Sequence, residues 1–522
     1  MHLRLLPLLF VVLLAPVQAW AQSPASASPA VQAVSATTMA VHVWPESLDP
    51  AAVQTGPATL LANLNEPLIR LKPDVLEMDP AASLAAGVTS AEDGRVWEVS
   101  LRPETRFPDG TPLDADAVVF SLSRLLLAGH PARPGVAAVP GVLKGLVKSV
   151  TAPRKDRVVI ELNAPYGPML SLLGSLQASV LSPASFKAGR LASVPLGFGP
   201  FTVGRQGPGR RMELVANPRY LRPVPLSRLD VVHVPAGTGR ILWMLSGRGD
   251  LVEGLSGQNV DDLGTRPEFK LEEKPGIGTV TLFFNPAAPP FQSIILREAL
   301  LRALNDDVMA PCLYQDRAKM FRSFFPPWSW GTKEAPTRIG YDVVEAKRLL
   351  NMGNVDKAGT AFVLWAVPSV EQNPASLAAL LDAIKSCLLE VGVSCLADVV
   401  SPSALESRLA AKAPGAVLYW NDPRIADPDD VTCSAIDKSH PLSKFAGLAV
   451  DEVQSLIAQA RGRDSLASRE LAYGELATRA ARDLTVVSLA SPRRVVAFRK
   501  RLSNVRLGID GQVQMGEVRV TP

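Results

Sequence analysis

Acidic and aromatic side chains gather in one short stretch of the second half of the chain. Residues 417–430 read VLYWNDPRIADPDD and carry an indole, an amide and four carboxylates. The first three, 417–419, have the character of a buried strand that ends in a loop. A carboxylate in such a loop can hold the ammonium group of a ligand through a charge-assisted hydrogen bond. The alternative is a solvated acidic turn in which Asp427 and Pro428 begin a helix.

Catalytic and metal chemistry have weaker support in the sequence. It contains no G-x-S-x-G and no H-E-x-x-H motif, and no cysteine spacing resembles a zinc site. The histidines beyond the first residues lack a local partner pattern; they are His42, His130, His233 and His440. We therefore expect no catalytic residue, no metal site and no cofactor. An exported hydrolase whose triad is assembled from distant segments stays open as the alternative.

Length and charge limit the class of protein. A chain of 522 residues is too long for one ordinary core and implies two or three domains. Lys and Arg total 54 against 50 for Asp and Glu, a net charge of +4, so nucleic acid is not an expected partner.

The first residues predict export. Residues 1–21 combine a basic start, an apolar run over 5–15 and an Ala-Trp-Ala end, as a cleaved signal peptide does. The apolar run is shorter than the about 20 residues that a membrane span needs. Residues 22–38 are rich in Ser and Ala and predict a disordered leader. We expect a mature protein in the periplasm.

An oxidising compartment gives the four cysteines two possible states. Cys387 and Cys395 enclose a short loop, and Cys312 and Cys433 remain, so three pairings are possible. A disulfide between the first two would contribute about 2 to 3 kcal/mol by the chain-entropy argument. Free buried thiols are the alternative.

The densest local signals lie in residues 96–124. Alternation over 96–101 predicts a strand with one buried face, and the Asp-Gly pair at 93–94 favours a hairpin into it. Asp114 is placed to cap a helix that Gly129 would end. Elsewhere we expect a strand over 39–44, a helix over 57–65 and a short helix over 79–86.

Several segments together resemble a known family. They are SLDP at 47–50, NEPLIRL at 65–71, PAASLAAG at 80–87, the stretch 90–126, PLGFGPF at 195–201, LVANPRY at 214–220, LFFN at 282–285 and the helical stretch 451–481. In this order and spacing they resemble the extracytoplasmic solute-binding proteins of ABC transporters, family 5, which includes dipeptide- and oligopeptide-binding proteins. Phe198, Ala117 and the segment 305–307 depart from the family pattern, so the ligand is not to be assumed.

The resemblance implies a fold and a partner. The fold is α/β, a two-lobed periplasmic binding protein of type II with three subdomains, mixed β-sheets and a hinge. Lobe I would comprise 39–57, 186–274 and 485–522, extended by a subdomain over 58–185, and lobe II would cover 275–484. Hinges would fall near 279–285 and 484–488. The protein would be a monomer that captures a small solute, a short peptide above all, and delivers it to a permease in the inner membrane; relatives of this fold also bind nickel complexes, sugars and opines.

The resemblance also suggests site residues. Residues 417–430 resemble a G-W-x-x-D…D-P segment whose first aspartate takes the α-ammonium group of the ligand. This role falls to Asp422, with Trp420 and Asn421 beside it. In peptide-binding relatives the residues just after the Asp-Pro of SLDP lie extended against the ligand backbone. By spacing they are Gln54, Thr55 and Gly56, for which a plain surface loop is the alternative.

Overall fold

The computed structural model describes residues 36–521 except 53–57, 73–76, 135–142, 144, 315, 330–338, 354–360, 369–373, 424, 464 and 509. The expected signal peptide lies outside the described residues. Strand β1 (Ala36–Val41) begins within the expected leader, because residues 36–38 pair in register with 228–230 of a neighbouring strand. The disordered leader over 22–38 is therefore wrong for its last three residues. Within the described part of the chain, no helix has the length and apolar character to cross a membrane.

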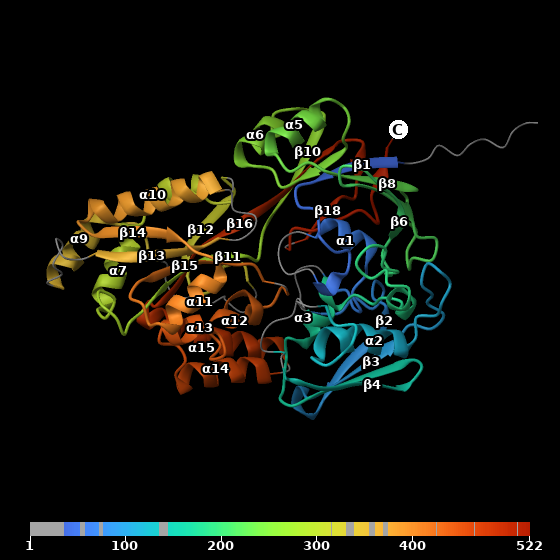
Figure 1. The fold of residues 1–522 in the computed structure, drawn as a ribbon, viewed down its shortest axis with the longest axis horizontal. Helices are drawn as coiled ribbons and strands as arrows, with labels where there is room; N and C mark the ends of the chain where they lie inside the picture. Colours follow the sequence, from blue (N-terminus) through green and yellow to red (C-terminus); the bar gives the residue numbers. More distant parts are fainter. Residues whose placement is uncertain are drawn as a thin grey trace, which may run out of the picture. The chain divides into compact units, whose positions relative to one another are not determined.

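One mixed sheet of twelve strands organises the chain (Figure 1). Five of its strands lie in the residues expected to form lobe II: β11 (Thr279–Phe284), β12 (Ala318–Ser323), β13 (Ala361–Val367), β14 (Ser394–Val399) and β15 (Ala416–Asn421). Six lie in the residues expected to form lobe I: β1, β6 (Phe201–Gly207), β7 (Arg211–Ala216), β8 (Arg228–His233), β9 (Leu251–Glu253) and β10 (Phe269–Pro275). The twelfth strand, β16 (Val486–Arg499), pairs with strands of both groups.

The register of β16 shows where the chain crosses between the groups. Residues 486–490 pair with β11, whereas 493–499 pair with β10. Pro492 stands between these two parts, and its carbonyl accepts a hydrogen bond of 2.7 Å from the backbone N–H of Gly276, in the segment that joins β10 to β11. The crossing thus lies at 275–279 and 491–493. The expected hinges, 279–285 and 484–488, fall largely within the paired lobe II strands.

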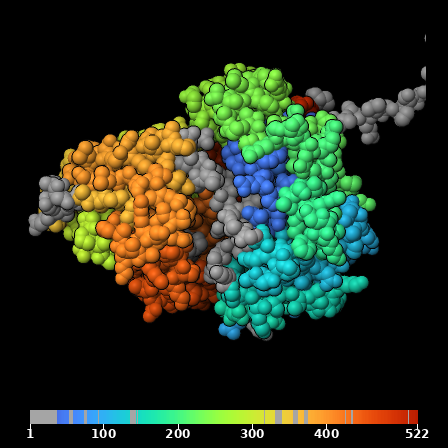
Figure 2. Space-filling view, in the orientation of Figure 1, coloured from blue at the N-terminus to red at the C-terminus, as the bar shows by residue number. Residues whose placement is uncertain are grey.

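Residues 58–185 contain a separate four-stranded antiparallel sheet. Its order is β2 (Ala85–Ala91), β3 (Val96–Leu101), β5 (Arg157–Leu162) and β4 (Val147–Arg154), with helix α2 (Ala115–Leu126) against it. Its own cluster of buried apolar side chains lies between these elements. In Figure 2 the cyan-to-teal part of the chain forms one continuous block of surface, as expected for a subdomain with its own core.

The predictions for this subdomain are confirmed in most details. Trp97, Val99 and Leu101 are buried, and β2 and β3 form the expected hairpin. The Asp114 side chain accepts from the N–H of Ala117 and caps α2, which ends at Leu126, before Gly129. The predicted helix over 79–86 is wrong: a turn leads into β2, whose ladder with β3 takes the backbone groups that a helix would use.

Helices cover the sheets. In lobe I and the subdomain they are α1 (Thr59–Leu64), α3 (Met169–Leu173), α4 (Pro183–Lys187), α5 (Gly237–Leu245) and α6 (Gly257–Gly264). In lobe II they are α7 (Ile294–Ala303), α8 (Asp306–Met309), α9 (Val343–Met352), α10 (Pro374–Glu390), α11 (Pro402–Ala410), α12 (Ser434–Ile436), α13 (Pro441–Phe445), α14 (Asp451–Gly462) and α15 (Leu466–Asp483). Strands β17 (Leu502–Ser503), β18 (Arg506–Leu507), β19 (Val513–Gln514) and β20 (Arg519–Val520) form two small sheets near the end of the chain.

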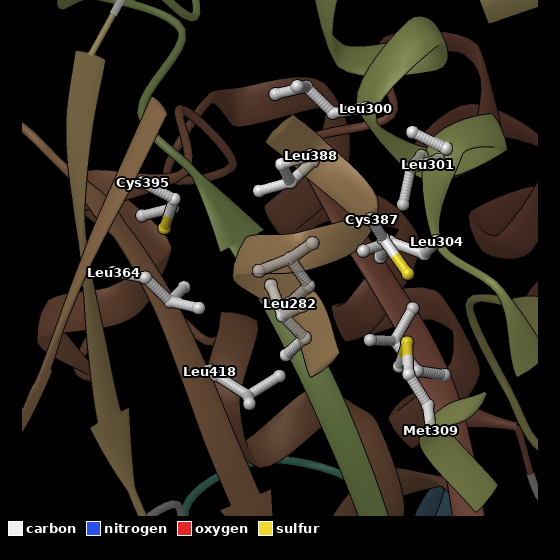
Figure 3. Packing of buried hydrophobic residues seen from close by; sticks show 14 of the residues in the cluster. Leu282, Leu300, Leu301, Leu304, Met309, Leu364, Cys387, Leu388, Cys395 and Leu418 are labelled. Carbon is white, nitrogen blue, oxygen red and sulfur yellow. The ribbon is translucent and has the colours of Figure 1, made fainter. Parts of the chain in front are cut away.

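The core of lobe II holds two of the cysteines. Cys387 on α10 and Cys395 on β14 are buried and carry thiols, so the disulfide alternative is not formed between them. Figure 3 shows their sulfur atoms well apart, with Leu388 and Leu282 between them in this view. Burial raises the pKa of the Cys395 thiol to about 11, which keeps it protonated at neutral pH. The side chain of Cys433 lies outside the described residues.

A buried ion pair joins α2 to the SLDP segment. Arg124, with 2% of its side chain exposed, donates to both carboxylate oxygens of Asp49, at 2.8 Å for Oδ2. The same guanidinium donates to the carbonyl of Ala132, and Asp49 Oδ1 accepts from the N–H of Ala51. The start of the loop that leads to residues 53–57 is therefore fixed by the subdomain.

Replacing Arg124 by Met should destabilise the protein by about 3 to 5 kcal/mol, because it leaves the Asp49 carboxylate buried without its cation. Urea unfolding followed by far-UV circular dichroism measures the loss. Arg154→Met is the matched control, since the Arg154–Asp156 pair is largely exposed; this variant should unfold almost as the wild type does. Equal midpoints for all three proteins would contradict the prediction.

Candidate functional site

Asp422 lies where the chain crosses between the two groups of strands. It follows β15, whose last residue, Asn421, pairs with Thr279 at the start of β11. A Cβ built on Gly278 would stand 3.2 Å from Asp422 Oδ1 and 3.7 Å from Pro492 Cδ. The half-buried carboxylate of Asp422 is thus adjacent to both crossing segments.

The two neighbours of Asp422 have structural contacts. Trp420 is 4% exposed and packs in the lobe II core, where its indole N–H finds no acceptor among the described residues. The side-chain amide of Asn421 donates to the carbonyls of Asp430 and Val431, at 3.3 Å for the first. Asn421 therefore ties the far end of the loop back to β15.

Asp427 is paired inside the protein. It is fully buried, and its Oδ1 accepts from the guanidinium of Arg469 on α15 at 2.7 Å. Its Oδ2 accepts from the hydroxyl of Ser171 on α3 at 2.8 Å. One carboxylate of lobe II thus binds a lobe II cation and a hydroxyl group of the subdomain.

Asp429 repeats this arrangement. Its Oδ1 accepts from Arg461 on α14 at 2.6 Å, and its Oδ2 from the phenol of Tyr166 at 3.1 Å. Burial raises the pKa of the Asp429 carboxyl, and the Arg461 cation opposes that rise. Burial also holds the pKa of Tyr166 well above its ordinary value, so the phenol stays a neutral donor. Asp430 is buried too, and its Oδ2 accepts from the N–H of Ile425.

The loop 425–431 therefore joins lobe II to the subdomain. Ile425 belongs to the apolar cluster of the subdomain, and the backbone N–H of Gly167 donates to the carbonyl of Arg461 at 2.6 Å. The solvated acidic turn considered from the sequence is wrong for 427–430. The helix start considered at Asp427 and Pro428 is confirmed: a helical turn begins at Pro428 and continues as the π-helical turn Asp429–Cys433.

The second set of expected ligand contacts, Gln54, Thr55 and Gly56, lies outside the described residues. The structure describes its two flanks, the 3-10 turn Pro50–Ala52 and helix α1.

A pocket with a cavity volume of about 50 Å³, partly open to solvent, lies at the crossing. Its walls come from lobe I, lobe II and β16: His42, Glu253, Gly254, Leu255, Tyr314, Arg317, Pro492, Arg493, Arg494, Val495, Leu507 and Gly511. Sequence reasoning selected none of these as a site. The only local signal is the pair of adjacent arginines at 493 and 494, a pattern that is also typical of a solvated face.

A polar chain at this pocket is not a catalytic triad. His42 Nδ1 lies 3.2 Å from Glu253 Oε1, and the hydroxyl of Thr59 donates to the other carboxylate oxygen. The carboxylate stands between the imidazole and the hydroxyl, whereas a nucleophile needs the base beside it. Thr59 also accepts from the backbone N–H of Val513. The arrangement holds His42 in place and gives Thr59 no base other than a carboxylate.

The structure predicts that substitution of Asp427 and substitution of Asp422, two carboxylates of the same loop, lower the free energy of unfolding by different amounts. Asp427→Ala should lower the free energy of unfolding by about 3 to 5 kcal/mol, because Arg469 would remain buried without its anion. Asp422→Ala should cost less than about 1 kcal/mol, as expected for a half-buried side chain. Urea unfolding of both variants beside the wild type measures the difference. Similar losses would contradict the assignment of Asp427 to structure.

Comparison with known proteins identifies the chain. Residues 79–440, more than half of it, match the family model described as bacterial extracellular solute-binding proteins, family 5 middle. The peptide transport periplasmic protein SapA of Salmonella typhimurium is 26% identical over 487 residues, 88% of this chain and 87% of that protein. The probable D,D-dipeptide-binding periplasmic protein DdpA of Escherichia coli is 27% identical over 315 residues, 58% of this chain and 59% of that protein.

Solved structures show the same fold. The dipeptide-binding protein from Pseudoalteromonas sp. SM9913, in complex with Met-Leu, aligns over 93% of this chain and 100% of its own with a TM-score of 0.74 at 23% identity. HbpA2 from Haemophilus parasuis aligns over 93% of this chain and 100% of its own with a TM-score of 0.81 at 20% identity. The expected two-lobed α/β fold of periplasmic binding proteins is confirmed. The chain belongs to the bacterial extracellular solute-binding proteins of family 5.

Proposed function

We propose that the protein is the periplasmic solute-binding component of an ABC importer. It captures a small solute, a short peptide above all, between its lobes and delivers it to a permease in the inner membrane. Membership of the family supports capture of a solute, and relatives of high coverage are named as periplasmic transport proteins. The signal-like residues 1–21 agree with export.

The relatives favour peptides over other solutes. SapA is named for peptide transport, DdpA for D,D-dipeptides, and proteins of Escherichia coli and Pseudomonas aeruginosa for dipeptides. Other proteins related by sequence or by fold bind different solutes: one is a heme-binding protein, and solved structures hold Fe(III)-EDTA or agropinic acid. The fold alone therefore does not select the ligand, and the side chains at the crossing must do so.

The observation that carries the proposal is the position of Asp422. Asp422 is half-buried beside Gly278 and Pro492, next to both segments at which the chain crosses between the groups of strands. A carboxylate here can hold the ammonium group of a solute between the lobes. The domain boundaries proposed from the sequence place Asp422 in lobe II and the partly described loop after Pro50 in lobe I.

Closure follows from the crossing segments. The chain crosses between the two groups of strands at 275–279 and 491–493, so these segments change backbone angles if one group turns relative to the other. Such a turn also acts on the contacts between loop 425–431 and the subdomain. A solute that contacts both groups binds the closed form more tightly than the open form and so shifts the population toward it. We expect the unliganded and liganded proteins to differ at these two segments.

The hydrolase alternative lacks a positive observation. The relatives are named as binding proteins, and the Thr59–Glu253–His42 chain has the wrong order for nucleophilic attack. A bound peptide recovered intact after incubation with the protein is the result expected for a binding component, and hydrolysis products would support the alternative.

The solute class is tested by thermal shift. The exported protein is screened against short peptides, opines, oligosaccharides and metal chelates, and short peptides with a free amino group should raise its melting temperature because they bind the folded state. The peptide proposal is wrong if no such peptide shifts the transition while another class does.

Asp422→Asn should weaken binding of free-amine peptides by at least about tenfold, or about 1.4 kcal/mol, because the ammonium group loses its anion. Isothermal titration calorimetry measures the dissociation constant for each peptide and for its N-acetylated form. The acetylated form should bind both proteins equally weakly. Asp156→Asn, a change to an exposed carboxylate of the subdomain, is the control. Unchanged affinity in Asp422→Asn would remove this residue from the site.

A further inference from the structure

We infer that the contact between the subdomain and lobe II is a reversible latch, which holds these two parts together before a solute binds. The inference rests on the proposed function for its consequence, since such a latch matters in a protein that closes over a solute. Its groups are Tyr166, Gly167 and Ser171 of the subdomain, with Ile425, Asp427, Asp429 and Arg461 of lobe II. They lie outside the crossing segments 275–279 and 491–493, so a turn at the crossing acts on their contacts.

Each carboxylate of the latch divides its two oxygen atoms between the two sides. The Oδ1 atoms of Asp427 and Asp429 bind the guanidinium groups of Arg469 and Arg461 within lobe II, at 2.7 and 2.6 Å. The Oδ2 atoms accept hydrogen bonds from neutral hydroxyl groups of the subdomain. Separation of the two sides would therefore break two hydrogen bonds and leave both negative charges with their cations.

This division is suited to a contact that opens and reforms. An ion pair split between the two sides would oppose separation strongly, because each half would lose its partner. The hydroxyl groups of Tyr166 and Ser171 carry no charge, and on release they can exchange the carboxylates for water. The latch thus favours the closed arrangement and allows it to open.

The main chain at Gly167 determines how closely the two sides approach. Its backbone N–H donates to the carbonyl of Arg461, in the last turn of α14, at 2.6 Å. A Cβ at this position would stand 2.3 Å from the carbonyl oxygen of Arg463 and 3.1 Å from Cδ of Arg469. Glycine therefore permits an approach that a side chain would prevent. The hydrogen bond also satisfies one of the carbonyls that the end of a helix leaves without an intrahelical partner.

An apolar contact accompanies the polar ones. Ile425 is 2% exposed and belongs to the buried cluster of the subdomain, although it lies in a loop of lobe II. Opening of the latch would expose this side chain to water, which costs free energy in proportion to the apolar area. The closed latch is therefore favoured by one buried side chain and three hydrogen bonds, all made by groups of the protein itself.

A latch of this kind changes the affinity for a solute. A solute that binds the closed form must supply the free energy of closure, and its apparent dissociation constant rises as the closed fraction falls. Contacts within the protein that favour the closed form supply part of that free energy in advance. Weakening the latch should therefore open the protein and reduce its affinity for solute together.

The test measures the radius of gyration of the full exported protein by small-angle X-ray scattering. Any bound small molecule is first removed by unfolding in urea and refolding. Two variants weaken the latch in different ways: Tyr166→Phe combined with Ser171→Ala removes both hydroxyl donors, and Gly167→Ala prevents the close approach. Both variants should have a larger radius of gyration than the wild type.

Tyr220→Phe and Gly129→Ala are the matched controls. The phenol of Tyr220 donates to the buried carboxylate of Glu66 at 2.7 Å, a bond of the same kind outside lobe II. A Cβ on Gly129, in the subdomain, would have no atom of the described residues within 4 Å. Both controls keep the groups of the latch and should have the radius of gyration of the wild type. Urea unfolding verifies that each variant is folded.

A second arm separates this inference from the peptide proposal. L-Ala-L-Ala is titrated calorimetrically, and loss of both hydroxyl donors should weaken its binding at least about tenfold, because hydrogen bonds to charged groups favour the closed form. If this dipeptide binds none of the proteins but the scattering differences are present, the peptide proposal fails and the latch stands. The inference is overturned if the wild type and both latch variants have the same radius of gyration, or if the controls expand as much. It is also overturned if a dipeptide that binds the wild type binds the latch variants equally well.

Discussion

Two buried carboxylate–guanidinium pairs, Asp427 with Arg469 and Asp429 with Arg461, set the position of the loop on which the candidate site depends. A buried charge that loses its partner costs several kcal/mol, so the loop cannot leave these cations without a large penalty. Because Ser171 and Tyr166 also bind the two carboxylates, the same pairs attach the loop to the subdomain. The acidic composition of the loop is mostly structural, which leaves Asp422 as its one half-buried carboxylate.

The second constraint is the continuity of β16. One strand of fourteen residues completes the sheet in both groups, so each group is stabilised by backbone hydrogen bonds to the same segment. The chain itself passes between the groups in this strand and in 275–279. Pro492 stands at the crossing and has no N–H to donate, which limits how tightly the middle of β16 can be held. The other backbone groups of this segment are bonded, since Ser491 and Pro492 pair with β12 and the N–H of Arg493 donates to the carbonyl of Arg317.

Local patterns in the sequence predict the fold well where neighbours in the chain decide the structure. The alternation over 96–101 and the Asp114 cap are examples, because a strand face and a helix cap need only nearby residues. The site is harder to predict. All four carboxylates in 417–430 look alike in the sequence, and those that are paired find their cations 32 and 42 residues further along. The pocket lined by His42 and Arg494 is formed by segments still further apart in the sequence. The periodicity of a local sequence pattern cannot predict that such distant segments come together. The resemblance to a family selects this loop as a candidate site, and it does not show that three of its four carboxylates are buried within the protein.

The side chain of Asn421 links the end of β15 to the loop that carries the buried ion pairs. Its amide donates to the backbone carbonyls of 430 and 431, so the residue beside Asp422 is bonded to the part of the loop that carries the buried pairs. A movement of Asp422 toward a solute must therefore act on a loop that the subdomain already holds. At the same time Gly276, which packs against Arg494, is hydrogen-bonded to Pro492. A solute that contacts both groups of strands would bind one arrangement of the crossing segments most tightly, so its binding energy would favour that arrangement over the others.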